Sequence, residues 1–389
     1  MAIPLGYNLR SIMVRKTTSF ATAAGVALVV FVLAAVMMLV NGIEKTMRDG
    51  STPGHAIVLS QGSEFELSSG IEEAAVNVVL AMPEVKKAPS GPLGVGEIVM
   101  VALLPKAGTS GFSNVTLRGV TEASLKLRAG WKIVEGTAPK PGTDEVAVGR
   151  AVRGRFEGLD LGNKVELTHG RSVNVVGIFE DAGSSTESEV WVDRNYLGAA
   201  YGRTGLVSSV RVELTSPSAV DAFAAEVAHD KRLGLDVVSE ATYQEHLSSG
   251  VTPLVSILGG AVSFFFAIGA MLGAMVTMYT AVANRSREIG TLRALGFARR
   301  SILFSFLVES ISLTLIGGLI GIAGAMLMQF AKFSILATGT WSEVTFTFEP
   351  TAKVIVVALG LAALMGVFGG FLPAMRAARM PPITAMRAR

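Results

Sequence analysis

The sequence contains no cysteine and few charged residues. Half of its 389 residues are hydrophobic and only 17% are Asp, Glu, Lys or Arg, whereas roughly a quarter of the residues of a soluble globular protein are charged. The absence of cysteine excludes a disulfide framework. The net charge of +3 is small, so its distribution along the chain is more informative than its sum. This composition is typical of a membrane protein.

Motifs of nucleotide-binding and hydrolytic enzymes are also missing. The sequence has no G-x-x-x-x-G-K-[ST] loop to hold ATP phosphates and no G-x-S-x-G nucleophile turn. Its histidines lack H-x-x-x-H spacing, which favours surface or hydrogen-bonded histidines over a zinc site. Basic residues lie beside apolar segments, so nucleic-acid binding is not expected. We expect no catalytic site, cofactor or metal in this chain.

Four apolar segments are each long enough to cross a bilayer, which takes about 20 residues. They run from Thr17 to Ile43, from Val251 to Asn284, from Ser301 to Ala331 and from Val354 to Met375. The first is longer than the apolar core of a signal peptide, which has about 7–15 residues. We therefore expect a retained first helix rather than a cleaved signal peptide.

Basic residues flank these segments unevenly. The positive-inside rule therefore predicts that both termini and the 284–300 loop face the cytoplasm, and that residues 44–250 lie outside. The residues that carry this prediction are Arg10, Arg15, Lys16, Arg285, Arg287, Arg293, Arg299, Arg300, Arg376, Arg379, Arg387 and Arg389.

Residues 44–250 show mixed helix and strand patterns. Alternation predicts strands at 55–61 and 207–214 and a hairpin over 164–181 that turns at His169 and Gly170. Helical spacing predicts helices over 70–85, closed by Pro83, and over 218–234, stopped by Gly234. The expected fold is an α-helical membrane protein with four transmembrane helices and a large extracytoplasmic α+β domain, in one or two lobes, between helices 1 and 2. The domains are 1–43, 44–250 and 251–389.

The membrane segments contain three pairs of glycines four residues apart. Such pairs let helices approach closely in lipid, and packing within one bundle is the preferred interpretation over a dimer seam. The pairs are Gly269 and Gly273, Gly317 and Gly321, and Gly366 and Gly370.

A charged loop separates the second and third apolar segments. In "REIGTLRAL", Ile289, Leu292 and Leu295 are three residues apart and predict one apolar face of a short helix over about 284–297. Gly296 stands where that helix would stop, with Arg293 in its last turn. On charge alone, an ordinary loop against lipid headgroups would explain this segment.

The pattern R-E-I-G-x-L-R-A-L-G-x-x-R-R-x-I…E closely resembles the signature of the FtsX-like permeases, the MacB or LolC/LolE type of ABC transporter. The ending "LPAMRAARMPPITAMR" and the order of one span, a large domain and three spans are similar too. The residues that carry the likeness are Arg287, Glu288, Ile289, Gly290, Leu292, Arg293, Ala294, Gly296, Arg300, Ile302, Glu309, Pro373, Ala374, Ala377, Pro381 and Ala385.

This resemblance implies a coupling helix that docks in a groove of a cytoplasmic ATP-binding subunit. Two copies of that subunit would bind ATP and Mg, and two permease chains, preferably as a homodimer, would pass the motion to the external domains. The apolar side chains would enter the groove and the arginines would meet acids at its rim, with lipid headgroups preferred for Arg285 and Arg299. The implied contact residues are Arg287, Glu288, Ile289, Gly290, Leu292, Arg293, Leu295, Gly296 and Arg300.

Glu309 is the only charge inside a predicted span. It lies only about 12 Å from Ser301 along the helix, so it either finds water or an arginine near the surface or links the coupling helix to the spans. Both interpretations remain open, because a carboxylate at this depth is costly unless solvated or paired.

The resemblance implies export or lipoprotein release at the outer face of the bacterial inner membrane, with a periplasmic adaptor or a lipoprotein as further partner. The alternative is an FtsX-like signalling module that regulates a cell-envelope hydrolase. FtsX itself generally carries a smaller external domain, so the size of residues 44–250 favours transport. A membrane-anchored external enzyme is disfavoured because no catalytic motif is present. Lipoproteins, peptides, antibiotics and glycolipids remain open as substrates.

We predict that Leu292→Asp weakens binding to the ATP-binding subunit and leaves membrane insertion intact, because it puts a charge into the docking face. Co-purification from membranes measures the effect. Unchanged recovery of the ATP-binding subunit would remove Leu292 from the docking surface.

Overall fold

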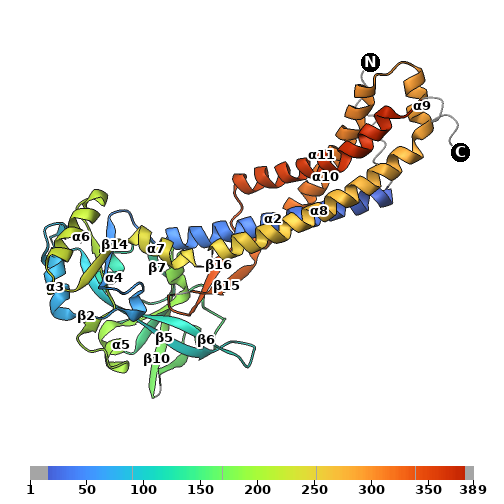
Figure 1. Cartoon of the computed structure of the whole chain (residues 1–389). Helices are drawn as coiled ribbons and strands as arrows, with labels where there is room; N and C mark the ends of the chain where they lie inside the picture. The colour runs from blue at the N-terminus through green and yellow to red at the C-terminus, as the bar shows by residue number, and fades with distance from the viewer. Residues whose placement is uncertain (1–15, 90, 169, 251, 338, 382–389) are drawn as a thin grey trace. The chain divides into compact units, whose positions relative to one another are not determined.

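The computed structural model describes residues 16–89, 91–168, 170–250, 252–337 and 339–381 (Figure 1). The chain divides into two compact units, which are described separately. The membrane unit comprises Met1–Gly42, Pro253–Ala331 and Thr347–Arg389, and the domain unit comprises Ile43–Thr252 and Lys332–Phe346. The turn predicted at His169 falls partly outside the described residues.

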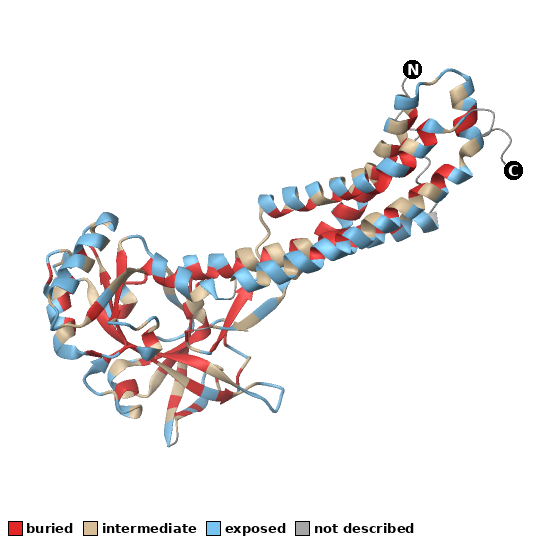
Figure 2. Ribbon diagram, viewed as in Figure 1, coloured by how far each residue is buried: buried red, intermediate tan, exposed pale blue. Residues whose placement is uncertain are grey.

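Four long apolar helices correspond to the four predicted spans. They are α2 (Lys16–Arg48), α8 (Thr252–Asn284), α10 (Arg299–Met326) and α11 (Ala352–Arg379), and each is long and apolar enough to cross a membrane. A short 3-10 turn, η4 (Leu327–Phe330), extends α10. Large apolar side chains of these helices such as Phe265 and Val356 are exposed, as expected for surfaces that face lipid. Figure 2 shows exposed residues along the ribbons of the long helices.

Two of the three glycine pairs pack inside this bundle. A Cβ on Gly317 or Gly321 would lie within 2.5 Å of a backbone carbonyl oxygen of α2, and Gly366 and Gly370 meet α10 side chains equally closely. Ser310 Oγ donates a hydrogen bond to Gly366 O at 2.8 Å across the same contact. Around Gly269 and Gly273 there is only open space. Packing within one bundle is therefore confirmed for two pairs and wrong for the third.

The domain unit is built on one mixed, ten-stranded sheet in the order β14-β1-β13-β5-β6-β11-β8-β10-β7, with β9 paired to β10. β6 and β11 run parallel, as do β8 and β10. The strands are β1 (His55–Ser60), β5 (Gly94–Pro105), β6 (Phe112–Val120), β7 (Trp131–Gly136), β8 (Glu145–Gly149), β9 (Lys164–Thr168), β10 (Arg171–Asp181), β11 (Glu189–Asp193), β13 (Ser209–Glu213) and β14 (Leu235–Ser239).

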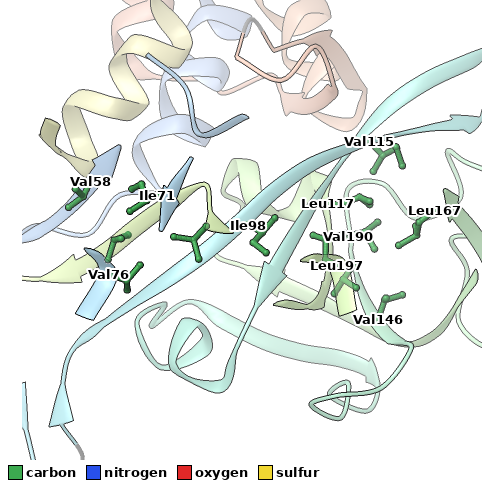
Figure 3. Packing of buried hydrophobic residues seen from close by; sticks show 14 of the residues in the cluster. Val58, Ile71, Val76, Ile98, Val115, Leu117, Val146, Leu167, Val190 and Leu197 are labelled. Carbon is green, nitrogen blue, oxygen red and sulfur yellow. The ribbon is translucent and has the colours of Figure 1, made fainter. Parts of the chain in front are cut away.

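The long strand β5 holds the two halves of this sheet together. Its first residues pair with β13 and its last eight pair with β6. Alternation then separates two faces: Val146 and Val148 of β8 join the main core, while Ala147 joins Phe179 and Trp191 on the other side. Figure 3 shows the valine- and leucine-rich packing of the main core, with Leu117, Val146 and Val190 among the labelled side chains.

Short helices and strands complete the domain unit, and they are η1 (Glu66–Ser68), β2 (Ile71–Glu72), α3 (Glu73–Ala81), β3 (Lys87–Ala88), β4 (Gly91–Pro92), α4 (Glu122–Lys126), η2 (Ser185–Ser188), α5 (Arg194–Ala200), β12 (Leu206–Val207), η3 (Pro217–Ala219), α6 (Val220–His229) and α7 (Glu240–Ser249). The predicted hairpin over 164–181 is confirmed by the antiparallel pairing of β9 with β10.

Two details of the predicted helices are wrong. Ile71 lies in β2, and α3 buries Val76 and Val79 while Val78 is exposed, because the helix starts two residues later than its apolar spacing suggested. The helix α6 ends at His229, before Gly234, whose positive φ of 58° serves a turn instead.

Residues 332–346 belong to the domain unit although they lie between α10 and α11 in the sequence. They form β15 (Lys332–Leu336) and β16 (Glu343–Thr347). Lys106 Nζ donates to Glu343 Oε1 at 2.7 Å, and Arg155 donates to the other oxygen of the same carboxylate. Thr345 N also donates to Ser188 Oγ at 3.0 Å. This strand pair is therefore attached by hydrogen bonds to residues more than a hundred positions earlier.

The glycine contacts generate a matched prediction. We expect Gly321→Leu to lower the thermal unfolding midpoint of the purified protein, because overpacking against the α2 backbone costs about 1–3 kcal/mol. Gly273→Leu, which adds the same side chain where there is open space, serves as the control. Equal midpoints for the two variants would contradict the close packing of Gly321 against α2.

Candidate coupling site

The predicted short helix in the charged loop is present as α9 (Ser286–Ala294). Gly296 has φ of 89°, its N–H donates to Arg293 O at 3.2 Å, and the N–H of Phe297 donates to Leu292 O at 3.1 Å. These two bonds form a Schellman motif, which satisfies the last carbonyls of a helix and requires a left-handed residue. The prediction that the helix stops at Gly296 is confirmed.

The three apolar residues of α9 do not share one environment. Ile289 is 2% exposed and lies in an apolar cluster with Met278, Ile302 and Phe306. Leu292 is half-buried, and Leu295, at the end of the helix, is 69% exposed. The predicted single apolar face is therefore wrong for Ile289, which packs into the core of its own unit.

The other predicted contact residues divide in the same way. Gly290 is buried, and Arg293 is half-buried with Nη1 donating to Phe297 O at 3.2 Å. The exposed members of the set are Arg287, Glu288, Gly296 and Arg300. Leu295 is the one large apolar side chain that is exposed beside these residues, so the surface of the loop is mainly polar and basic.

Arg285 is the centre of the polar contacts at this site. Its Nε lies 2.9 Å from Glu288 Oε2 and its Nη1 lies 3.1 Å from Glu309 Oε2, and its guanidinium carbon lies 5.4 Å from the centre of the Phe306 ring. The side chains of Arg285 and Glu309 are 11% and 7% exposed. The preference for lipid headgroups at Arg285 is therefore wrong, and Glu309 has an arginine partner.

Comparison with known proteins is informative for both units. Residues 19–230 match the family model of a MacB-like periplasmic core domain, and residues 260–382 match that of the FtsX-like permease C-terminal region. The first match alone covers more than half of the chain. This chain belongs to the MacB- and FtsX-like family of ABC transporter permeases. Family membership, with four helices apolar enough to cross a membrane, makes it a permease of the inner membrane.

This chain matches almost the full length of one relative and only part of the length of another. It is 25% identical to an uncharacterised ABC transporter permease, YknZ, of Bacillus subtilis over 97% of both chains. It is 32% identical to a macrolide export ATP-binding/permease protein, MacB, of Chlorobium luteolum over 46% of this chain and only 27% of that protein. A crystal structure of the YknZ extracellular domain aligns with 48% of this chain at 18% identity and a TM-score of 0.36.

Sequence reasoning allowed Arg285 as a partner of Glu288 and an arginine as a partner of Glu309, and both pairs are present. The pair with Glu288 had a local signal, because the two residues are three apart, where helical side chains meet. The burial of Ile289 was missed and had no signal in the loop itself, because the residues that cover it, such as Ala374 and Ala377, come from helix α11.

The ion pair at this site generates a stability prediction. Arg285→Met should lower the stability of the purified permease by about 3 kcal/mol, because it removes the ion pair with the buried Glu309 carboxylate. The double variant Arg285→Met with Glu309→Met should regain most of that loss. Arg299→Met, which changes an exposed arginine of the same loop, should stay within about 0.5 kcal/mol of the wild type. A double variant no more stable than Arg285→Met alone would contradict the pairing.

Proposed function

We propose that this permease couples ATP hydrolysis by a separate cytoplasmic subunit to movement of its external domain, for export or lipoprotein release at the outer face of the membrane. The observation that carries this proposal is the similarity to YknZ, which is named a permease, over 97% of both chains. The absence of a phosphate-binding loop from the sequence supports it.

The names of other relatives are consistent with this proposal. MacB of Chlorobium luteolum and PvdT of Pseudomonas syringae are each called an ATP-binding/permease protein, and this chain covers 27% and 54% of their length. Their names also specify export of a macrolide or of pyoverdine. We propose an assembly of two permease chains with two ATP-binding subunits, in which both termini and α9 face the cytoplasm. Basic residues beside the spans support this orientation.

The exposed surface of the charged loop is the proposed docking site. Leu295 supplies the apolar contact, because Ile289 is already buried. Arg300 and Arg287 lie exposed in the same loop and would face acidic residues on the ATP-binding subunit, where charges at the rim favour orientation and association rate. Because α9 is held at one end by the Schellman motif and at the other by Arg285, the loop has a fixed shape to present.

We expect Leu295→Asp to reduce recovery of the ATP-binding subunit at least about tenfold, equivalent to ~1.4 kcal/mol, in a gentle affinity purification from membranes. Leu295 is a cleaner test than Leu292, which is half-buried. Leu103→Asp is the matched control, since Leu103 is 64% exposed on β5 of the domain unit.

The chains that co-purify decide the function. An ATP-binding subunit with an external adaptor or channel supports export, and one with lipoproteins supports lipoprotein release. An envelope hydrolase in their place would favour the signalling function. Absence of any ATP-binding subunit from the wild-type preparation would overturn the proposal.

A further inference from the structure

Residues 332–346, which we call the strap, connect α10 to α11 in the sequence but belong to the domain unit. Ala331 alone separates the strap from η4, the turn that extends α10, and residues 348–351 lead from β16 to α11. The strands β15 and β16 pair with each other in a two-stranded sheet of their own. The strap is therefore held to the rest of the domain unit by contacts that involve side chains, and not by joining the ten-stranded sheet.

Glu343 makes the ionic contact between the strap and the rest of the domain unit. It is 8% exposed, and its two carboxylate oxygens accept hydrogen bonds from Lys106 Nζ, at 2.7 Å, and from Arg155. Burial by itself would raise the pKa of Glu343, but hydrogen bonds from Lys106 and Ser113 and the charge of Arg155 hold that pKa below its ordinary value. Each oxygen of the charged carboxylate thus has a cationic partner, which is the condition under which a buried ion pair is favourable.

Hydrogen bonds on both sides of Glu343 attach the strap to β6 and η2. Asn114 Nδ2 donates to Trp341 O at 3.0 Å, the hydroxyl oxygens of Thr116 and Ser342 lie 2.6 Å apart, and Thr345 N donates to Ser188 Oγ at 3.0 Å. Asn114 and Thr116 belong to β6, the strand that also carries Arg118. The strap is therefore fixed to the centre of the ten-stranded sheet and not to its edge.

The helix that precedes the strap is bound to the charged loop. Arg285, directly before α9, lies 3.1 Å from Glu309 of α10, and α10 continues as one helix from Arg299 to Met326. A displacement of α9 would therefore reach α10 through this ion pair and reach the strap at the other end of the helix. A second route leads through α8, which joins α9 to α7 of the domain unit.

The segment that follows the strap is fixed to α2 within the membrane unit. Glu349 N donates to Met38 O at 3.0 Å, and Asn41 Nδ2 donates to Thr351 Oγ1 at 3.1 Å. A Cβ added to Gly42 would overlap the carbonyl oxygen of Thr347, so the two backbones meet where a side chain would not fit. The strap is thus tied to the membrane unit at both ends, by the chain to η4 and by hydrogen bonds to α2.

We propose that the strap passes movement of α10 to the external domain, with Glu343 as the positioning residue that fixes the strap to the domain unit. Coupling between distant sites travels through contiguous bonded and packed elements, and the charged loop, α10, the strap and β6 form such a series. Because α8 and the strap act on different points of the domain unit, a displacement of α10 relative to α8 would turn the domain. This inference rests on the proposed function, since an ATP-binding subunit must displace α9.

The test measures the distance between two spin labels by pulsed electron paramagnetic resonance. The sequence has no cysteine, so Glu64→Cys in the domain unit and Lys353→Cys in α11, both at exposed positions, give the only labelling sites on this chain. The full-length permease with its co-purified ATP-binding subunit is measured in lipid nanodiscs, first without nucleotide and then with ATP, Mg²⁺ and vanadate. We expect nucleotide to change the distance, and Glu343→Gln to reduce that change at least about twofold. Glu157→Gln, at an exposed glutamate of the same unit, should leave it unaltered.

The rate of ATP hydrolysis and the unfolding midpoint separate a coupling role from a structural one. Both should stay close to the wild-type values in Glu343→Gln, because the strap lies in the external part of the chain. A hydrolysis rate that falls in proportion to the distance change would overturn the coupling role, and so would a distance change as large as that of the labelled parent. No distance change in the labelled parent would instead overturn the proposed function, and the strap inference with it.

A second variant decides the matter if Glu343→Gln does not fold. Insertion of Gly-Ser-Gly-Ser after Ala331 keeps the Glu343 contacts and puts a flexible linker between α10 and the strap. This insertion should reduce the distance change in the same way as the loss of the Glu343 charge. An unaltered distance change in the folded insertion variant would show that α10 does not act through the strap.

Discussion

The guanidinium of Arg118 is the contact on which the domain unit depends. From β6 it reaches Glu97 on β5, Glu189 on β11 and Glu66 on η1, and it is 5% exposed. Burying ions in this way is favourable only when the geometry satisfies every partner. Arg128 meets that condition for Glu97 by binding both of its oxygens, at 2.7 and 2.8 Å. A slip of one strand would separate these charges, so the network selects one register for the sheet.

The membrane unit uses the same principle with fewer groups. Arg285 collects Glu288 from its own helix and Glu309 from α10, so that the charged loop is bound to the helix that follows it. Elsewhere in this unit, close contact replaces charge, because lipid offers no hydrophobic drive between helices and small residues let backbones meet. Gly321 and Gly366 supply that contact on opposite partners, α2 and α10. The charged loop is therefore held by ion pairs, and the helices are held by close packing at glycines.

Patterns in the sequence predicted where the helices lie, but they did not predict which side chains are buried by neighbouring helices. The four spans, the short helix of the loop and its stop at Gly296 all follow from local signals: length, spacing and the left-handed conformation that glycine adopts easily. Ile289 is buried because α11 packs against it. A side chain at Gly273 would meet no neighbouring atom, and this depends on how the helices pack together. The spacing of three residues between Arg285 and Glu288 indicated that pair, but no spacing indicated that Arg285 also pairs with Glu309. No local pattern indicated that Glu343 pairs with Lys106 and Arg155.

That last pairing means that the domain unit is discontinuous in the sequence. Its strands β15 and β16 are synthesised after α8 and α10, so the carboxylate that Lys106 and Arg155 hold does not exist until those helices have been made. Until then, residues 43–252 must keep the binding surface for β15 and β16 accessible. Folding of this protein is therefore ordered: the external domain is completed only after two further membrane helices have been synthesised.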